Sequence, residues 1–211
     1  MKILFIAIIL ILNLINEIRG HGMVMSPPGR GSRWRTNSSA PINYDDNGTN
    51  CGGYSNQWMN NNGLCGICGD PYQAAKPRAN ELGGKYGGVG VIVANYTKGS
   101  VIQVRVKITA NHLGKFLFDI CNLDYEDESE ECFAKNQLLT IDGKKEYPIG
   151  TAAMDYYVSL QLPSTLSCKH CVLRWQYICG NNWGWCPEGG GRLGCGPQEN
   201  FRTCSDIKIV N

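Results

Sequence analysis

The clearest hydrophobic pattern in the chain is a strict alternation over residues 101–110. Apolar side chains occupy every second position from Ile102 to Ala110, and Gln, Arg, Lys and Thr fill the positions between them. A period of two is that of a β-strand with one buried face, because successive side chains point to opposite sides. Further runs predict strands over residues 115–122, 155–162, 171–179 and 207–210.

Residues 25–90 show no such period. Gly, Asn, Pro and Ser dominate this stretch, in pieces such as SPPGRGSRWR and NYDDNGTNCGGYSNQWMNNNG. This composition is typical of loops, and no amphipathic helix or internal repeat occurs elsewhere. Short strands joined by turn-rich connections predict an all-β fold, an antiparallel β-sandwich with long disulfide-stapled loops. Loops at one end of such a sandwich commonly carry binding and catalytic residues.

The first twenty residues have the pattern of a signal peptide. Lys2 precedes an apolar run that reaches Leu12, and polarity returns before the small residue Gly20. The run is shorter than the ~20 residues of a membrane-spanning helix, so a secreted product without a membrane anchor is expected. Cleavage after Gly20 makes His21 the first residue of the mature chain. Residues 21–211 are then expected to form a single domain.

Charge gives no sign of a nucleic-acid partner. Beyond residue 20 the chain holds 18 basic and 17 acidic residues, a net charge of +1. The acidic run over residues 124–131 lacks the ligand spacing and central Gly of an EF-hand, so a solvated loop is predicted there. Asn37, Asn47 and Asn95 begin Asn-x-Ser/Thr sequons, which are candidates for glycosylation in a eukaryotic secreted protein.

All 11 cysteines lie beyond the leader, which predicts disulfides in a secreted protein. The odd count leaves at least one thiol unpaired or bonded between molecules, and the sequence does not give the connectivity. A four-cysteine zinc site at Cys65-x-x-Cys68 and Cys168-x-x-Cys171 is the alternative. It is less favoured, because the two pairs are far apart and seven more cysteines surround them.

The three histidines suggest a copper site. His21, once freed at the N-terminus, offers two nitrogen ligands, its α-amine and its imidazole. A second imidazole completes a T-shaped set of three nitrogens, which favours Cu(II) among divalent first-row metals. His112 lies two positions after Ala110, in phase with the inward-facing residues of the alternating strand. It is therefore the predicted source of the second imidazole. His170 lies between two cysteines and is predicted to be a surface residue.

Much of the chain beyond residue 20 also resembles a known family, in register. The segments that carry the resemblance are HGMVMSPPGRGSRWR (21–35), NYDDNGTNCGG (43–53), GLCGICGDPYQ (63–73), ITANHLGKFLFDIC (108–121) and LGCGPQENFRTCSDIKI (193–209). They resemble the lytic polysaccharide monooxygenases of auxiliary activity family 15. The resemblance implies a fibronectin- or immunoglobulin-like sandwich whose flat face docks on crystalline chitin or cellulose. It also implies a monomer that binds one copper ion in a histidine brace.

The resemblance also assigns roles to individual residues. His21 and His112 would be the copper ligands, and Phe201 would fill the axial side without ligating. Ala110 resembles the small residue that shapes access to copper. Glu199 resembles the polar residue that touches bound oxygen species, with Gln198 as the alternative.

The implied activity is oxidative cleavage of chitin, with C1 oxidation favoured over C4. Copper cycling between Cu(I) and Cu(II) would use an external reductant and H2O2 or O2. A non-catalytic chitin-binding module and a histidine-brace copper carrier remain alternatives. The aromatic residues available for substrate contact are Trp34, Tyr44, Tyr54, Trp58, Trp183 and Trp185.

Overall fold

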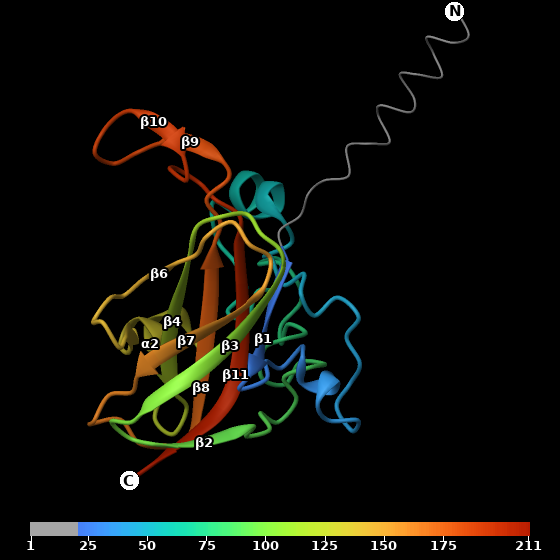
Figure 1. Cartoon of the computed structure of the whole chain (residues 1–211). Coiled ribbons are helices and arrows are strands. Elements are labelled where there is room, and N and C mark those ends of the chain that lie inside the picture. Colours follow the sequence, from blue (N-terminus) through green and yellow to red (C-terminus); the bar gives the residue numbers. More distant parts are fainter. Residues whose placement is uncertain (1–20) are drawn as a thin grey trace, which may run out of the picture.

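The computed structural model describes residues 21–211, so the leader and the cleavage after Gly20 lie outside the described residues. Two β-sheets and a separate hairpin make up the fold (Figure 1). The first sheet has the order β1 (His21–Ser26), β3 (Val101–Ala110), β7 (Asp155–Gln161) and β5 (Leu139–Thr140). The second has the order β2 (Ala94–Thr97), β11 (Asn200–Val210), β8 (Cys168–Ile178), β4 (Lys115–Asn122) and β6 (Tyr147–Pro148).

Neighbouring strands run antiparallel in both sheets, except that β2 lies parallel to β11. The hairpin consists of β9 (Trp183–Trp185) and β10 (Gly191–Leu193). Among the described residues, helical structure is limited to short segments at η1 (Arg33–Arg35), η2 (Asn56–Asn60) and α2 (Glu130–Ala134). Within residues 21–211, no helix has the length and apolar character needed to cross a membrane.

The core lies between the two sheets and is rich in aromatic rings. The inward side chains of β3, from Ile102 to Ile108, are at most 3% exposed. Phe116 on β4 is the centre of the aromatic packing, with ring centroids 5.4 Å from Trp175 and 5.3 Å from Tyr177 on β8. Each such buried apolar side chain stabilises the fold by about 1.5–3 kcal/mol. The predicted β-sandwich is therefore confirmed.

The predicted strands are all present, but two were predicted too short. β8 begins three residues early, at Cys168, and β11 begins at Asn200 rather than at residue 207. The first half of β11 carries polar residues on its buried positions, which hid it from a hydrophobic pattern. Asp206 there pairs with Arg30, and Cys204 forms a disulfide. The short edge strands β1, β2, β5 and β6 were missed altogether, as were the two short strands at residues 183–185 and 191–193.

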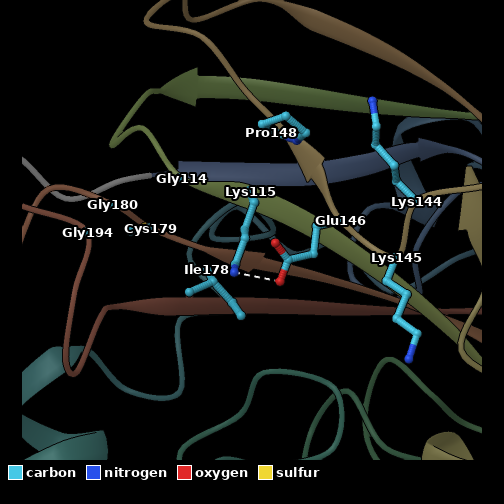
Figure 2. Close-up of a pocket in the computed structure, with 10 residues that line it drawn as sticks. All are labelled: Gly114, Lys115, Lys144, Lys145, Glu146, Pro148, Ile178, Cys179, Gly180 and Gly194. Carbon is cyan, nitrogen blue, oxygen red and sulfur yellow. Dashed lines mark hydrogen bonds and ion pairs between the residues drawn. The ribbon is translucent and has the colours of Figure 1, made fainter. Parts of the chain in front are cut away.

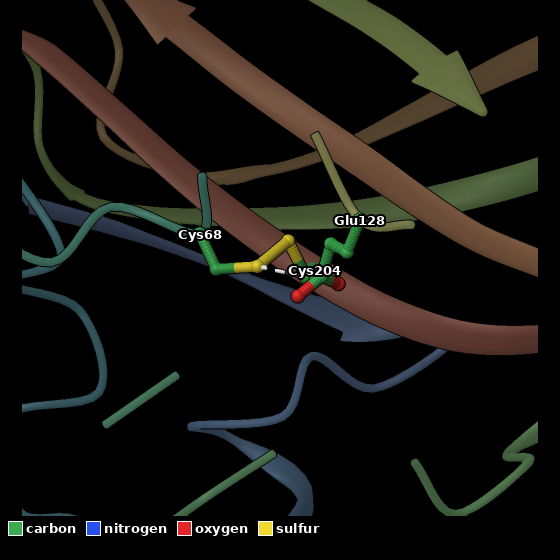
Figure 3. A group of neighbouring side chains, drawn as sticks. All are labelled: Cys68, Glu128 and Cys204. Carbon is green, nitrogen blue, oxygen red and sulfur yellow. Dashed lines mark hydrogen bonds between the residues drawn. A yellow bond between two sulfur atoms is a disulfide. The ribbon is translucent and has the colours of Figure 1, made fainter. Parts of the chain in front are cut away.

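The long loop between β1 and β2 is attached to the sandwich by covalent and ionic links. Cys68 is bonded to Cys204 on β11, and Cys51 to Cys65 within the loop. The remaining disulfides are Cys121–Cys132, Cys168–Cys171 and Cys186–Cys195. The four-cysteine zinc alternative is therefore wrong. Figure 3 shows Glu128 beside the Cys68–Cys204 bond, whose oxidised sulfurs are not free to ligate a metal.

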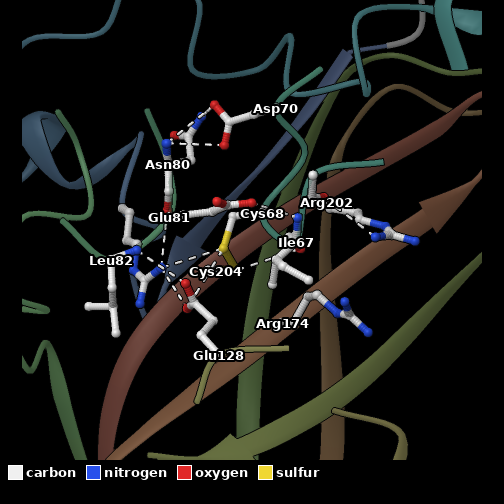
Figure 4. The surroundings of a disulfide bond; sticks show 12 residues. Ile67, Cys68, Asp70, Asn80, Glu81, Leu82, Glu128, Arg174, Arg202 and Cys204 are labelled. Atoms are coloured by element: carbon white, nitrogen blue, oxygen red, sulfur yellow. Dashed lines mark hydrogen bonds and ion pairs between the residues drawn. A yellow bond between two sulfur atoms is a disulfide. The ribbon is translucent and has the colours of Figure 1, made fainter. Parts of the chain in front are cut away.

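A buried ion cluster surrounds that disulfide (Figure 4). Arg30 lies 2.7 Å from both Asp206 and Glu128, and His170 lies 2.8 Å from Asp206. Burial alone would raise the pKa of Asp206, but its bonds to Arg30 and His170 hold that pKa below its usual value. The acidic run is thus not wholly a solvated loop, since the side chain of Glu128 is only 8% exposed and pairs with Arg30. His170 is half-buried, with a ring nitrogen hydrogen-bonded to Asp206, rather than a free surface residue.

Candidate metal centre

The pairing of β1 with β3 fixes the position of His21. His21 is the register partner of Ala110, at the end of the sheet where β3 leaves for the turn that holds His112. Gly22 permits this close approach, because a Cβ there would meet Ile108 at 2.7 Å and Trp175 at 3.0 Å. The fold therefore brings the two predicted ligands to one end of the sandwich.

His112 is held by its backbone in a tight turn after β3. Its N–H donates to the hydroxyl of Tyr177 at 2.8 Å, and its carbonyl accepts from the N–H of Gly180 at 2.8 Å. Leu113 and Gly114 follow with φ of 56° and 94°, and a Cβ at Gly114 would meet the carbonyl oxygen of Ile178 at 2.1 Å. The turn consequently requires glycine at position 114 and places the imidazole at a defined point.

The imidazole of His112 is 6% exposed, and neither ring nitrogen has a hydrogen-bond partner among the described residues. Its Nδ1 lies 3.4 Å from Oε2 of Glu199, within ion-pair distance but without hydrogen-bond alignment. A buried polar group left unsatisfied costs about 1–3 kcal/mol. A metal bond to one ring nitrogen would satisfy it, so the residue fits a ligand role.

Glu199 lies beside His112, whereas Gln198 is occupied elsewhere. Oε1 of Glu199 accepts from Nδ2 of Asn50 at 2.9 Å, which orients the carboxylate. Both ends of the Gln198 amide are bonded to the backbone of Asn182, at 3.0 Å each, and its nitrogen also donates to the carbonyl of Cys195 at 2.7 Å. Gln198 thereby holds the base of the β9–β10 hairpin, and the geometry favours Glu199 over Gln198 next to His112.

Phe201 supports this end of the sandwich from within the core. Its ring is fully buried and stacks on Tyr177, with centroids 5.7 Å apart and an interplanar angle of 25°. Tyr177 in turn accepts the hydrogen bond from the backbone of His112. Phe201 has no donor atom, which agrees with a neighbour that crowds a metal without binding it.

Cys179 is a site residue that the sequence did not identify. It is buried and is the one cysteine outside a disulfide in the described chain. Its sulfur, a ring nitrogen of His112 and a carboxylate oxygen of Glu199 lie within 4.8 Å of one another. Burial, with a smaller effect from the charge of Glu199, raises the pKa of the thiol well above its usual value. The odd cysteine count signalled one such thiol but not its position.

Three cavities are lined by residues of this site. A cavity of about 260 Å³ is lined by His112, Glu199 and Asn50, and a polar cavity of about 450 Å³ on the His21 side shares Asn50. A third, of about 610 Å³, has Cys179 in its wall and is rimmed by lysines, one of which, Lys115, pairs with Glu146 at 2.6 Å (Figure 2).

Three of the six candidate substrate aromatics are exposed. Tyr44 is 84% exposed, Trp183 59% and Trp185 71%, whereas Trp34, Tyr54 and Trp58 are half-buried. The two tryptophans lie on the hairpin that leaves the sandwich at the same end as the start of β1 (Figure 1). Their rings pack edge to face with centroids 5.5 Å apart.

Comparison with known proteins gives a consistent result. A family model described as lytic polysaccharide mono-oxygenase, cellulose-degrading, matches residues 21–207. The structure of a lytic polysaccharide monooxygenase AA15 from Thermobia domestica in the Cu(I) state is 44% identical, with a TM-score of 0.86, over 90% of this chain and 98% of that one. A chitin binding domain from Burkholderia pseudomallei, 10% identical over 91% of this chain and 100% of that one, has a TM-score of 0.52 and shares the fold. No curated protein sequence matches significantly.

Proposed function

Because the chain belongs to the lytic polysaccharide monooxygenases of auxiliary activity family 15, and is thus a copper-dependent oxidoreductase, we propose that His21 and His112 hold its copper. The observation that carries this proposal is the β1–β3 register. It sets His21 opposite Ala110, two residues before a buried imidazole whose ring nitrogens have no hydrogen-bond partner in the described part of the chain. Cleavage after Gly20 would add the α-amine as the third nitrogen, so the site depends on processing of a secreted precursor.

The surrounding residues orient the ligands. The hydroxyl of Tyr177 fixes the backbone of His112, and Phe201 fills the space beneath it. Glu199, held by Asn50, presents a carboxylate at the edge of the site. When bound, copper supplies the one-electron chemistry that uses H2O2 or O2 and an external reductant to oxidise a C–H bond beside the glycosidic oxygen. The protein contributes ligand geometry and a defined polar surrounding.

We further propose that the substrate is crystalline chitin, oxidised at C1, and that the protein acts as a secreted monomer. Support for chitin comes from the resemblance to auxiliary activity family 15, whereas the broader family model is described as cellulose-degrading. The exposed Trp183 and Trp185 are available for contact with pyranose faces. Cellulose is therefore the substrate to be tested beside chitin.

The test uses the chain beginning at His21, loaded with copper and given ascorbate and H2O2. Mass spectra should show aldonic-acid oligosaccharides from chitin, and His112→Ala should give none and should lose the three-nitrogen Cu(II) EPR spectrum. His170→Ala is the matched control and should keep both. Adsorption to chitin with no oxidised product would indicate a binding module, and tight copper binding without adsorption would indicate a copper carrier.

A further inference from the structure

Cys179 occupies an unusual position for an unpaired thiol. It follows the last residue of β8 and lies two positions after Tyr177, whose hydroxyl accepts the backbone N–H of His112. Only 2% of its surface is exposed. A buried cysteine commonly packs as a small apolar residue, but this one faces an imidazole and a carboxylate.

A second observation supports a ligand at this point. His112 is 94% buried and aims a ring nitrogen at the same space, with no hydrogen-bond partner among the described residues. With Glu199 and Cys179 it forms a group whose three donor atoms lie within 4.8 Å of one another. Ligand atoms around a tetrahedral ion of zinc size are roughly 3.5 Å apart, so a modest closure would complete the geometry.

We propose that His112, Cys179 and Glu199 form a second metal site that holds Cu(I) without the N-terminal amine. Thiolate and imidazole donors suit this soft ion. Cu(I) replaces the thiol proton, which leaves to solvent, so one proton is released for each ion bound and no oxidant or reductant is needed. The site shares His112 with the histidine brace, and in that respect the inference rests on the proposed function.

The placement of these three residues, called the trio below, makes them a holding site for copper. The brace needs an amine that processing must first release, whereas none of the three residues depends on the N-terminus. His112 and Glu199 line the cavity of about 260 Å³, and Cys179 lines the cavity of about 610 Å³ on its other side (Figure 2). An ion bound at the trio is already next to one of the brace ligands and can pass to His21 once its amine is free.

The test separates the two sites with a chain whose α-amine belongs to Gly20 instead of His21. A chain that begins at Gly20 lacks the brace but retains the trio, and Cu(I) affinity is measured by competition with bicinchoninate. We expect one Cu(I) per chain, and X-ray absorption should show one sulfur neighbour. Cys179→Ser and His112→Ala in the same chain should each weaken binding by more than about 100-fold, since loss of a direct ligand exceeds the effect of its supporting partners. His170→Ala should leave the affinity unchanged.

Two outcomes would overturn the inference. One is a Gly20 chain that does not bind Cu(I), and the other is a Cys179→Ser chain that binds it as tightly as the unsubstituted one. Neither outcome affects the proposed function, which is tested by Cu(II) binding to the chain beginning at His21. In that processed chain, Cys179→Ser should keep the three-nitrogen EPR spectrum, because the brace does not use the sulfur.

Discussion

Replacing Tyr177 by Phe removes one hydroxyl and preserves the packing of the ring. The hydroxyl accepts the backbone N–H of His112 at 2.8 Å, and burial raises its pKa so that it stays protonated at any working pH. The stacked contact with Phe201 and the edge-to-face contact with Phe116 remain in the variant. The N–H of His112 is then buried without an acceptor, which costs about 1–3 kcal/mol.

Urea unfolding measures this loss directly. With a slope of about 2 kcal/mol per molar urea, a loss of 2 kcal/mol lowers the midpoint by about 1 M. Copper affinity should fall by about 10–100-fold, the usual effect of removing a group that orients a ligand. Tyr147→Phe is the control, because Tyr147 also packs against Phe116, but its hydroxyl makes no hydrogen bond with the described residues. Equal stabilities of the two variants would refute the argument that the hydroxyl supports His112.

Two further predictions concern the rest of the structure. Asp206→Asn should lower stability at pH 6, because the folded pKa of Asp206 lies below its unfolded value and its contribution is complete above about pH 4. The difference from the unsubstituted chain should shrink as the pH falls to 3, and urea midpoints at the two pH values check it; a constant difference would contradict the ion-pair argument. Gln198→Ala should free the β9–β10 hairpin by removing its bonds to Asn182 and Cys195, which is seen as faster amide hydrogen exchange over residues 183–195, and unchanged exchange would refute that role.

The predictions from sequence succeeded where one physical signal dominated. β3 was predicted with its observed limits, because its alternation reflects one face on the core and one on solvent. The choice of His21 from a cleavage rule, and of His112 from the parity of that strand, stays a prediction, although the β1–β3 pairing does bring both residues to one end of the sandwich. Copper itself came from the chemistry of an N-terminal histidine.

Ion pairs and hydrogen bonds between residues far apart in the sequence could not be predicted in the same way. The start of β11 was missed because the buried Asp206 is compensated by Arg30, which is distant in sequence. Glu128 was assigned to solvent for the same reason. The choice of Glu199 over Gln198 depends on hydrogen bonds to Asn50 and to the hairpin base, which no local pattern shows.

The order in which the site residues occur along the sequence has a consequence for biosynthesis. His21 is translated long before Glu199 and Phe201, which lie near the other end of the described residues. The loop after β1 is also fastened to β11, through a bond between Cys68 and Cys204 that spans 136 residues. A nascent chain therefore carries His21 long before the residues that would surround it have been made. Metal insertion into the proposed site belongs after translation has ended, and a stop codon that removes only the last strand would take away Phe201 and the disulfide partner of Cys68, and with them the support of the proposed copper site at the opposite end of the sequence.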